Sequence, residues 1–558
     1  MRRKYCPPVL CYSLLLLFAI SLPASAQTTA PSDWTWMGGS STVGSSCSGA
    51  NWCGQAGVYG TLGTPAAGNV PGSRIYAASW TDTSGHFWLF GGIGYDANGQ
   101  GGGLNDLWEF NPSTNEWAWM GGSSSVNPSS VYGTLGTPAP GNNPGPRAEG
   151  VTWTDSKGNV WLFGGGNLND FWEFDLSTNE WAWMGGSIPS ADYCPPGSYG
   201  TLGTPAAGNI PGCRNLAIGW TDSNGNFWLF GGGATNNNGY YGNRNDLWEF
   251  NPSTSQWTWI SGSNTINSTG AYGTQGVPSA NNIPGARGTA GIAAARWIDS
   301  NGNLWLFGGQ GFASAAGMQG LLNDLWEFSP TTQTWTWVSG SNIINAVGDY
   351  GTMGTSASAN SPGARNGSVS WVDANGNFWL YGGGGLSTTT NTTGDLSDLW
   401  EFSPTTKQWT WVSGNNTGGI LPDYGTLGTA STSNTPGGRD SAVGWTDSSG
   451  NLWLFGGFDY DTTTGANGTN DFLNDLWKFD TTTKEWTWMG GSNTGNANGV
   501  YGTLGTPAAG NVPGARGSEG VALTWTDNSG NLWLFGGDGY GTTGASDSLL
   551  NDLWRYQP

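Results

Sequence analysis

Three acidic side chains interrupt an otherwise neutral pattern in this sequence: Glu149, Asp440 and Glu519. Equivalent positions in related segments of the chain hold small or neutral residues. Two carboxylates held roughly 5–10 Å apart can hydrolyse a glycosidic bond, one as the acid and the other as the base or nucleophile. Acids at such positions can also bind a cation or a basic group, or they can be solvated or paired with arginine. All of these interpretations remain open at this stage.

The chain contains a single histidine, His86. It lies in a short turn at a position where related segments carry Asn159 and Asn226. A Ser-His-Asp triad needs a histidine base oriented by a carboxylate beside a nucleophile, and a turn variant does not provide that arrangement. We therefore predict that His86 is a turn residue. No catalytic residue, metal site or cofactor is expected.

Aromatic side chains occur in loops that differ from one part of the chain to another. A loop aromatic can stack on a sugar ring or anchor a partner, but it can also pack on neighbouring loops. Together with Glu149, Asp440 and Glu519, the predicted ligand-binding residues are Tyr95, Tyr240, Tyr241, Phe312, Phe458, Tyr460 and Tyr540.

These candidates are carried by a repeat. The motif Asn-Asp-Leu-Trp-Glu-Phe occupies residues 105–110, and close relatives of it begin at Asn169, Asn245, Asn323, Ser397, Asn474 and Asn551. The aspartates of successive copies are separated by 64, 76, 78, 74, 77 and 77 residues. Seven copies at a nearly fixed period indicate an array of similar structural units.

One unit shows how the repeat should fold. Residues 147–153, 160–163, 169–174 and 181–183 are rich in aromatic and β-branched residues and are divided by turn signals, so we predict four short strands, a to d. Of the 36 tryptophans, 35 fall at five fixed positions in the repeat, which favours packing between sheets over sugar-binding platforms. Strand a is rich in small residues, as expected near the crowded centre of radially arranged sheets.

The two ends of the chain complement each other. The last copy stops after strand c at residue 556, and Trp34 and Trp36 near the N-terminus supply the missing Trp-x-Trp of strand d. We therefore predict an all-β fold, a seven-bladed β-propeller of four-stranded antiparallel blades whose last blade is closed by the N-terminal strand. The expected blades are approximately 73–121, 147–185, 214–261, 287–339, 365–413, 439–490, and 516–558 with 33–39.

Each repeat is similar to the kelch motif, in which an apolar strand is followed by Gly-Gly, Asn-Asp-Leu-Trp and a later Trp. The array from residue 33 to 558 resembles the kelch propeller of the galactose oxidase central domain. The resemblance implies the fold but not the activity, since one fold serves many functions. The copper site of that family needs two histidines and a cysteine-linked tyrosine, which a chain with one histidine cannot supply. The repeat also departs from the ~50-residue kelch period through a long segment between strands d and a.

Seven arginines recur, one in each repeat. They could form a ring that attracts an anion, or each could pair with the repeat aspartate and nearby carbonyl groups. We favour the structural role because every unit has one. They are Arg74, Arg147, Arg214, Arg287, Arg365, Arg439 and Arg516.

The first 26 residues have the features of a secretory signal peptide: Arg2, Arg3 and Lys4, an apolar run, and a small-x-small site ending at Ala26. The mature domain, 27–558, would carry 14 basic and 38 acidic residues, a net charge of about -24 that argues against nucleic acid as a partner. No other apolar run is long enough to span a bilayer. The chain is expected to be secreted, cell-surface or periplasmic, with disulfides Cys47–Cys53 and Cys194–Cys213.

Strand parity assigns the loops to two faces. The b-to-c and d-to-a connections share one face, and they carry most of the length and variety, so any binding site is expected there. The predicted function is an exported, non-catalytic propeller, expected as a monomer, that binds a protein or carbohydrate ligand. The alternatives are an extracellular carbohydrate-active enzyme that uses carboxylates near the mouth of the central channel, and a purely structural surface protein.

Overall fold

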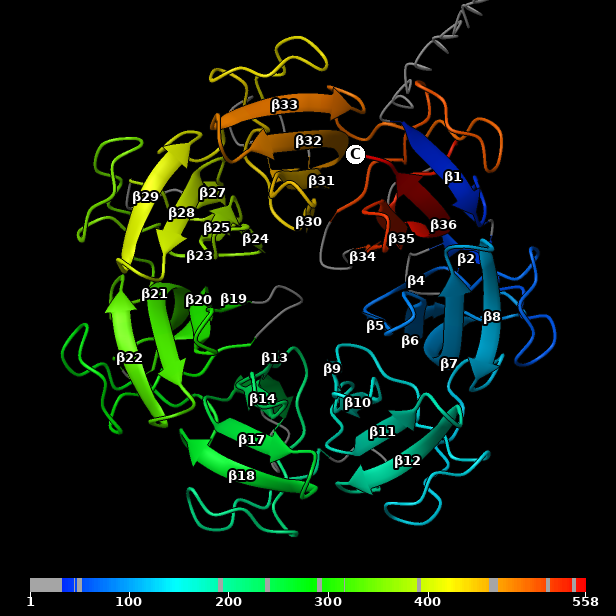
Figure 1. The fold of residues 1–558 in the computed structure, drawn as a ribbon, viewed down its shortest axis with the longest axis horizontal. Helices are drawn as coiled ribbons and strands as arrows, with labels where there is room; N and C mark the ends of the chain where they lie inside the picture. Colours follow the sequence, from blue (N-terminus) through cyan, green and yellow to red (C-terminus); the bar gives the residue numbers. More distant parts are fainter. Residues whose placement is uncertain are drawn as a thin grey trace, which may run out of the picture. The chain divides into compact units, whose positions relative to one another are not determined.

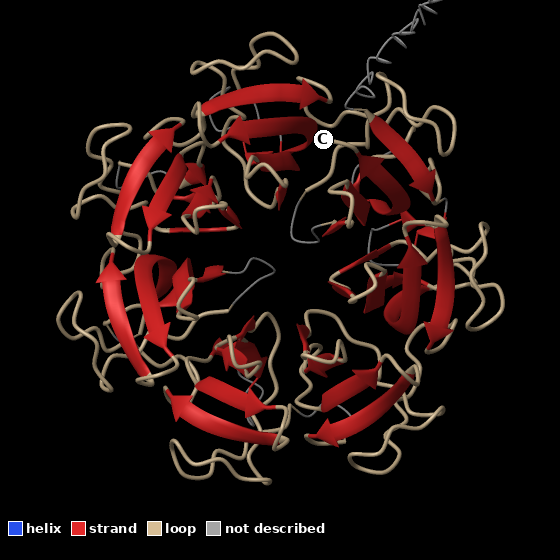
Figure 2. Ribbon diagram, viewed as in Figure 1, coloured by secondary structure: helices blue, strands red, loops and turns tan. Residues whose placement is uncertain are grey.

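Strands alternate with turns throughout the described chain, and no helix occurs in that part of it (Figure 2). The computed structural model describes residues 33–44, 46–47, 53–188, 194–235, 241–288, 294–315, 317–388, 393–460, 470–517, 522–543 and 548–558. From Ser32 to Pro558 these residues belong to one compact unit. The expected signal peptide, Tyr240 and Glu519 lie outside the described residues, and only the backbone of Tyr460 is described.

Five sheets are four-stranded antiparallel meanders in which the strands follow chain order. The first two contain β9 (Val151–Thr154), β10 (Val160–Phe163), β11 (Phe171–Asp175) and β12 (Glu180–Gly185), and then β13 (Ile218–Thr221), β14 (Phe227–Phe230), β17 (Leu247–Asn251) and β18 (Gln256–Ser261). The third contains β19 (Ala295–Ile298), β20 (Leu304–Phe312), β21 (Gln319–Ser329) and β22 (Thr334–Ser339). The last two contain β24 (Val369–Val372), β25 (Phe378–Tyr381), β28 (Leu399–Ser403) and β29 (Gln408–Ser413), and then β30 (Val443–Thr446), β31 (Leu452–Tyr460), β32 (Asn470–Asp480) and β33 (Glu485–Gly490).

Two larger sheets contain the chain's ends and the first repeat. One joins β4 (Arg74–Ile75), β5 (Ala78–Thr81), β6 (Phe87–Tyr95), β7 (Gly101–Asn111) and β8 (Glu116–Gly121). The other joins β1 (Trp34–Gly38), β2 (Ser46–Cys47), β3 (Cys53–Gly54), β34 (Leu523–Thr526), β35 (Leu532–Gly539) and β36 (Ser548–Tyr556). Two small sheets lie in loops: β15 (Gly233–Thr235) with β16 (Tyr241–Asn243), and β23 (Arg365–Asn366) with β26 (Gly384–Gly385) and β27 (Gly394–Asp395).

The turn between the first two strands of a repeat shows how the sequence specifies these hairpins. Asp155 Oδ1 accepts hydrogen bonds from the backbone N–H groups of Lys157 at 2.9 Å and Asn159 at 3.0 Å. Gly158 has a φ of 90°, which a residue with a side chain rarely adopts. The second carboxylate oxygen of Asp155 accepts the indole N–H of Trp161 at 3.2 Å and so ties the turn to the sheet behind it.

The apolar core lies between the sheets. One cluster packs Trp80 and Leu107 against Val160 and Trp172 of the next sheet along the chain, and five further clusters join successive sheets in the same way. A seventh cluster joins Trp525 and Phe535 of the last sheet to Phe87 and Trp108 of the first. In Figure 1 the sheets follow one another around a common centre, with β5, β9, β13, β19, β24, β30 and β34 nearest to it.

The N-terminal strand pairs with the C-terminal strand. β1 is antiparallel to β36, with Trp34 opposite Tyr556 and Trp36 opposite Trp554. Trp34 is buried, and its ring centroid lies 5.4 Å from that of Phe455 in the neighbouring sheet. The all-β class and the antiparallel sheets predicted from the sequence are therefore confirmed, and the arrangement is compatible with a propeller.

The segments between strands d and a, which were expected to contribute to a loop face, fold over the outer edges of the sheets. In the first repeat Ala66 forms a β-bridge with Trp117 of β8. Asn69 Nδ2 donates to the carbonyl oxygens of Thr64 and Trp117, both at 3.0 Å. Equivalent asparagines repeat the contact at the other sheets, including Asn511, which donates to the Trp34 carbonyl oxygen at 3.1 Å. These segments therefore cover backbone groups that an open sheet edge would leave unpaired.

Candidate functional site

Each repeat buries one charged cluster. Arg74 donates to both carboxylate oxygens of Asp106, at 2.7 and 2.8 Å, and Asp106 Oδ2 also accepts from Tyr59 Oη and Trp108 Nε1, both at 2.7 Å. The arginine–aspartate pairs of the seven repeats are Arg74–Asp106, Arg147–Asp170, Arg214–Asp246, Arg287–Asp324, Arg365–Asp398, Arg439–Asp475 and Arg516–Asp552. The tyrosines that complete them are Tyr59, Tyr132, Tyr199, Tyr272, Tyr350, Tyr424 and Tyr501.

In the first repeat, burial and pairing determine the charge states of the cluster. Burial by itself would raise the pKa of Asp106, but the Arg74 charge and its hydrogen bonds hold that pKa below the usual value. Burial, followed by the negative charge of Asp106, raises the pKa of Tyr59. The arginine and aspartate are therefore an ion pair and the tyrosine is a neutral donor. Each of the seven arginines is buried and paired with an aspartate, so they do not present a ring of exposed cations to an anion.

Two predicted ligand-binding aromatics lie in the interior. Tyr95 is buried in a small cluster with Ile75 and Leu549, and Phe312 is buried at the end of β20. Two others are half-buried and belong to one aromatic group. The ring of Phe472 lies 5.5 Å from that of Phe458 and 6.0 Å from that of Tyr540. These four side chains thus contribute mainly to loop packing.

Tyr241 and Glu149 approach each other from neighbouring sheets. Tyr241 begins β16 and is 48 % exposed. Glu149 is half-buried just before β9, with a φ of 63° that is uncommon for a residue with a side chain. Burial, and then the negative charge of Glu149, raise the pKa of the Tyr241 hydroxyl, so the two side chains interact. An exposed aromatic ring beside a carboxylate offers a stacking surface and hydrogen-bond acceptors.

Asp440 lies near a second carboxylate that sequence reasoning missed. A Cβ built on Gly384 would be 3.5 Å from Asp440 Oδ2, 3.5 Å from Asn366 Oδ1 and 3.8 Å from Asp395 Oδ1. These oxygens surround one point beside the small sheet of β23, β26 and β27. Asp395 occupies the position of Gly103 in the first repeat, so a charged residue in place of glycine was a signal that could have identified it.

The predicted acids do not form one group in the described chain. Glu149 precedes β9 and Asp440 precedes β30, and these strands belong to sheets on opposite sides of the common centre in Figure 1. Backbone hydrogen bonds link Asp440 to Phe458 in both directions at 2.9 Å, so this acid belongs with the β31 loop.

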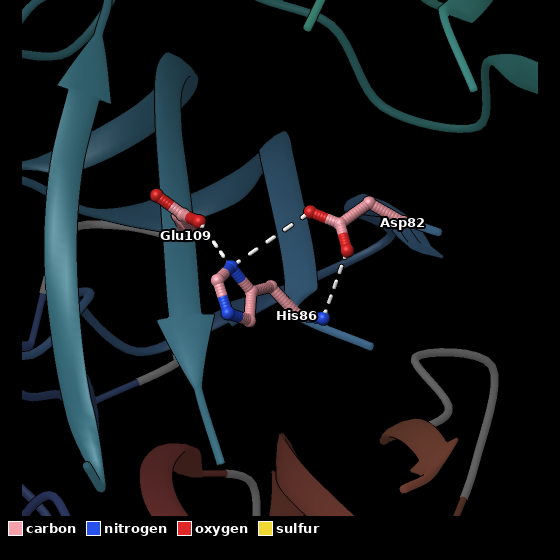
Figure 3. Close-up of side chains that lie close together, drawn as sticks. All are labelled: Asp82, His86 and Glu109. Atoms are coloured by element: carbon pink, nitrogen blue, oxygen red, sulfur yellow. Dashed lines mark hydrogen bonds and ion pairs between the residues drawn. The ribbon is translucent and has the colours of Figure 1, made fainter. Parts of the chain in front are cut away.

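His86 lies in a different cluster, between two carboxylates (Figure 3). Its Nδ1 is 2.5 Å from Glu109 Oε1 and 3.9 Å from Asp82 Oδ2, and the three side chains offer ligand atoms within 4.8 Å of one another. The same bridge is made by asparagine elsewhere: Asn377 Nδ2 donates to Glu401 Oε1 at 2.9 Å and to Asp373 Oδ2 at 3.1 Å. His86 therefore occupies a structural hydrogen-bonding position of the repeat.

The cysteines lie in two neighbouring pairs. Cys194 and Cys213 form a disulfide, as predicted. Cys53 is also disulfide-bonded, and Cys47 lies opposite it in the pairing of β2 with β3. The partner predicted for Cys53 is therefore next to it in the sheet.

Among the described residues, no helical segment has the length and apolar character needed to cross a bilayer. No protein-family model matches this chain, and no curated protein sequence is significantly similar to it.

Proposed function

We propose that this chain is an exported, non-catalytic binding scaffold built as a seven-bladed kelch-type propeller, with β1 and β36 joining the two ends of the ring. The β1–β36 pairing and the core cluster between the last and first sheets support closure. The Cys194–Cys213 disulfide and the signal-like N-terminus support export, because disulfides persist in oxidising compartments.

The observation that carries the binding role is that the exposed Tyr241 lies within electrostatic reach of Glu149. Aromatic rings stack on the apolar faces of sugars, and a carboxylate accepts hydrogen bonds from their hydroxyl groups. The side chains that recur in every repeat are already used in buried pairs, so recognition falls to residues that vary between repeats. We propose a glycan as the ligand of this surface, and a protein partner is the other ligand class that the surface could serve.

The binding role can be tested with the purified mature protein on a panel of immobilised glycans, followed by calorimetric titration of any hit. Tyr241→Ala removes the ring and should abolish measurable binding, whereas Tyr241→Phe keeps the ring and should retain most of it. Glu149→Gln should weaken binding without altering the melting temperature. Equal binding by wild type and Tyr241→Ala would exclude this surface as the glycan site.

A carbohydrate-active enzyme is the second candidate, and one observation favours it. Carboxylate oxygens of Asp395 and Asp440 lie 3.8 and 3.5 Å from the position that a Cβ on Gly384 would occupy. Glycoside hydrolysis requires two carboxylates that converge in this way. Incubation of the protein with the glycans it binds, followed by analysis for reducing ends, separates the two candidates. Cleavage lost in Asp395→Asn and Asp440→Asn would favour the enzyme, and intact glycan would favour the scaffold.

A further inference from the structure

The innermost strands carry one charged side chain. β5, β9, β13, β24, β30 and β34 consist entirely of uncharged residues, whereas β19 reads Ala295-Arg296-Trp297-Ile298. The residue before the tryptophan is Ser79, Thr152, Gly219, Ser370, Gly444 or Thr524 in the other six strands. Arg296 therefore replaces a small neutral residue in β19, which is one of the strands nearest the common centre of the sheets (Figure 1).

The packing around β19 determines which way Arg296 faces. Ala294 and Ile298, two residues before and after it, pack against the cluster that contains Ile218 and Trp220 of the preceding sheet. Alternate residues of a strand share a face, so the Arg296 side chain leaves β19 toward β13. Trp297 faces the opposite way, where its ring stacks on Phe378 at 5.1 Å.

The gap between adjacent innermost strands does not hold a long side chain. At Gly219 a Cβ would lie 2.6 Å from Val151 Cγ1 and 3.0 Å from Trp153 Nε1 of the preceding sheet. Gly444 is equally confined, with Trp371 Nε1 at 2.5 Å. The guanidinium of Arg296 therefore extends out of this interface, in agreement with its exposed side chain.

Although exposed, the Arg296 guanidinium has no partner among the described residues. No described residue forms an ion pair or hydrogen bond with it. The surrounding protein lowers the pKa of the guanidinium by desolvation, and no carboxylate raises it. An arginine on an ordinary protein surface is well hydrated, whereas this one is reached by solvent but partly shielded by protein. A charged group in such surroundings attracts an opposite charge more strongly than it would in bulk water.

We propose that Arg296 is the centre of an anion-binding site on the innermost strands and that its ligand is a small oxyanion, either a carboxylate or a phosphate. The planar guanidinium matches both groups through two parallel hydrogen bonds. The mature chain's strongly negative net charge opposes polyanions, so the ligand carries one or two charges. Among the described residues, the neutral neighbouring strands supply no charge that would neutralise this cation. This proposal does not depend on the glycan role proposed for the Tyr241 surface.

Isothermal titration of the mature protein with sodium galacturonate, galactose and sodium phosphate tests the proposal. Wild type should bind at least one of the two anions saturably, and the affinity should fall as salt is added. Uncharged galactose should not compete with the anion for the site. Arg296→Gln should weaken anion binding at least about tenfold, which is the size expected for losing hydrogen bonds to a charged group. Arg296→Lys keeps the positive charge but cannot donate two parallel hydrogen bonds, so an intermediate affinity is expected.

Two controls complete the design. Lys157→Gln removes an exposed charge from the turn between β9 and β10 and should leave anion affinity unchanged. Tyr241→Ala should also leave it unchanged, which distinguishes this site from the proposed glycan surface. Galacturonate binding without phosphate binding would identify a carboxylate ligand. The proposal is overturned if wild type binds neither anion, or if Arg296→Gln and Lys157→Gln reduce the affinity equally while both retain the wild-type melting temperature.

Discussion

Arg74 and Asp106 form a bidentate ion pair in which Nη1 and Nη2 donate to the two carboxylate oxygens at 2.7 and 2.8 Å, and neither side chain is accessible to solvent. Arg74 also donates to the carbonyl oxygens of Gly72 at 3.0 Å and Gly91 at 2.9 Å. One guanidinium thus joins the segment before strand a to the glycines after strand b and to the aspartate of strand c. The same ion pair occurs in every repeat, which indicates that it stabilises the fold.

Removing one member of the Arg74–Asp106 pair should destabilise the protein strongly, whereas replacing both members with apolar residues should not. Asp106→Ala leaves a buried guanidinium uncompensated and should lower the free energy of unfolding by about 3–5 kcal/mol, whereas the double variant Arg74→Met with Asp106→Leu should lose much less. Guanidinium chloride denaturation provides the measurement. The exposed Lys407–Glu327 pair is the control, since Lys407→Ala should cost under about 1 kcal/mol. Equal losses for Asp106→Ala and Lys407→Ala would contradict the assignment.

The buried tyrosines predict a loss of stability in alkali. Burial, and then the nearby aspartate, raise the pKa of Tyr59 above its ordinary value of about 10, and the tyrosines of the other repeats are raised in the same direction. Below pH about 10 both folded and unfolded states keep the hydroxyl protonated, so the stabilisation is complete. As the pH rises above 10, the unfolded chain ionises first, and stability falls until the folded-state pKa values are passed.

Urea denaturation at pH 9 and pH 11 checks this direction, and the free energy of unfolding should be clearly smaller at pH 11. Tyr59→Phe cannot ionise, so it should reduce the difference between the two pH values even though it loses the hydrogen bond to Asp106. The exposed Ile188 supplies a control, because Ile188→Ala removes no titratable group and should leave the difference between the two pH values unchanged. Identical stability at both pH values would refute the argument.

Periodicity explains which parts of this structure could be predicted. Trp108, Asp106 and Arg74 each recur in every repeat, so their spacing revealed strands, turns and pairing before any geometry was known. The electrostatic interaction between Tyr241 and Glu149 could not be predicted in the same way. It joins residues of neighbouring sheets, and Tyr241 lies in a loop that differs from one repeat to another. The positive φ of Glu149, 63°, is by contrast shared by Tyr76, Leu216 and Ser441 at the equivalent positions.

The contact that Asn69 makes at the outer edge of its sheet could not be predicted from the sequence, for a different reason. Its recurrence was visible in the sequence, but a segment of glycine, proline and asparagine has no hydrophobic period that reports where it packs. Only the fold places Asn69 Nδ2 against the carbonyl oxygen of Trp117. Arg296 could not be predicted as a functional residue for a related reason. It is a single exception in the repeat, and its importance depends on where β19 lies in the fold.

The pairing of β1 with β36 predicts that the N-terminal strand is essential to stability. Trp34 is almost fully buried, with ring centroids of Phe455 at 5.4 Å and Tyr556 at 5.2 Å. Trp34→Ala should therefore lower the free energy of unfolding by about 3–5 kcal/mol, the usual cost of truncating a large core side chain. Removal of residues 27–40 should destabilise the protein further by exposing the edge of β36.

Thermal denaturation followed by tryptophan fluorescence measures both effects, with circular dichroism to follow the loss of strands. The exposed Ile188 supplies a control, because Ile188→Ala removes apolar volume from the surface and should leave the melting temperature nearly unchanged. A deletion variant that melts at the wild-type temperature would show that the two ends of the chain do not support each other.

His86 provides the last prediction, since its cluster can be interpreted in two ways. As a hydrogen-bonding residue it fills the place that Asn159, Asn303 and Asn377 fill elsewhere, each of which donates to a strand c glutamate at 2.9–3.0 Å. His86→Asn should then keep the fold, with a change in unfolding free energy of under about 1 kcal/mol, because the amide restores the bond to Glu109. Glu109→Ala should lower the free energy of unfolding by more than His86→Asn, since it removes the shared acceptor.

As a metal site, the cluster of His86, Asp82 and Glu109 would instead bind Zn²⁺, and zinc would raise the melting temperature of wild type but not of His86→Asn. Thermal denaturation of both proteins with and without zinc separates these outcomes, and we expect the melting temperatures of wild type and His86→Asn to respond to zinc alike.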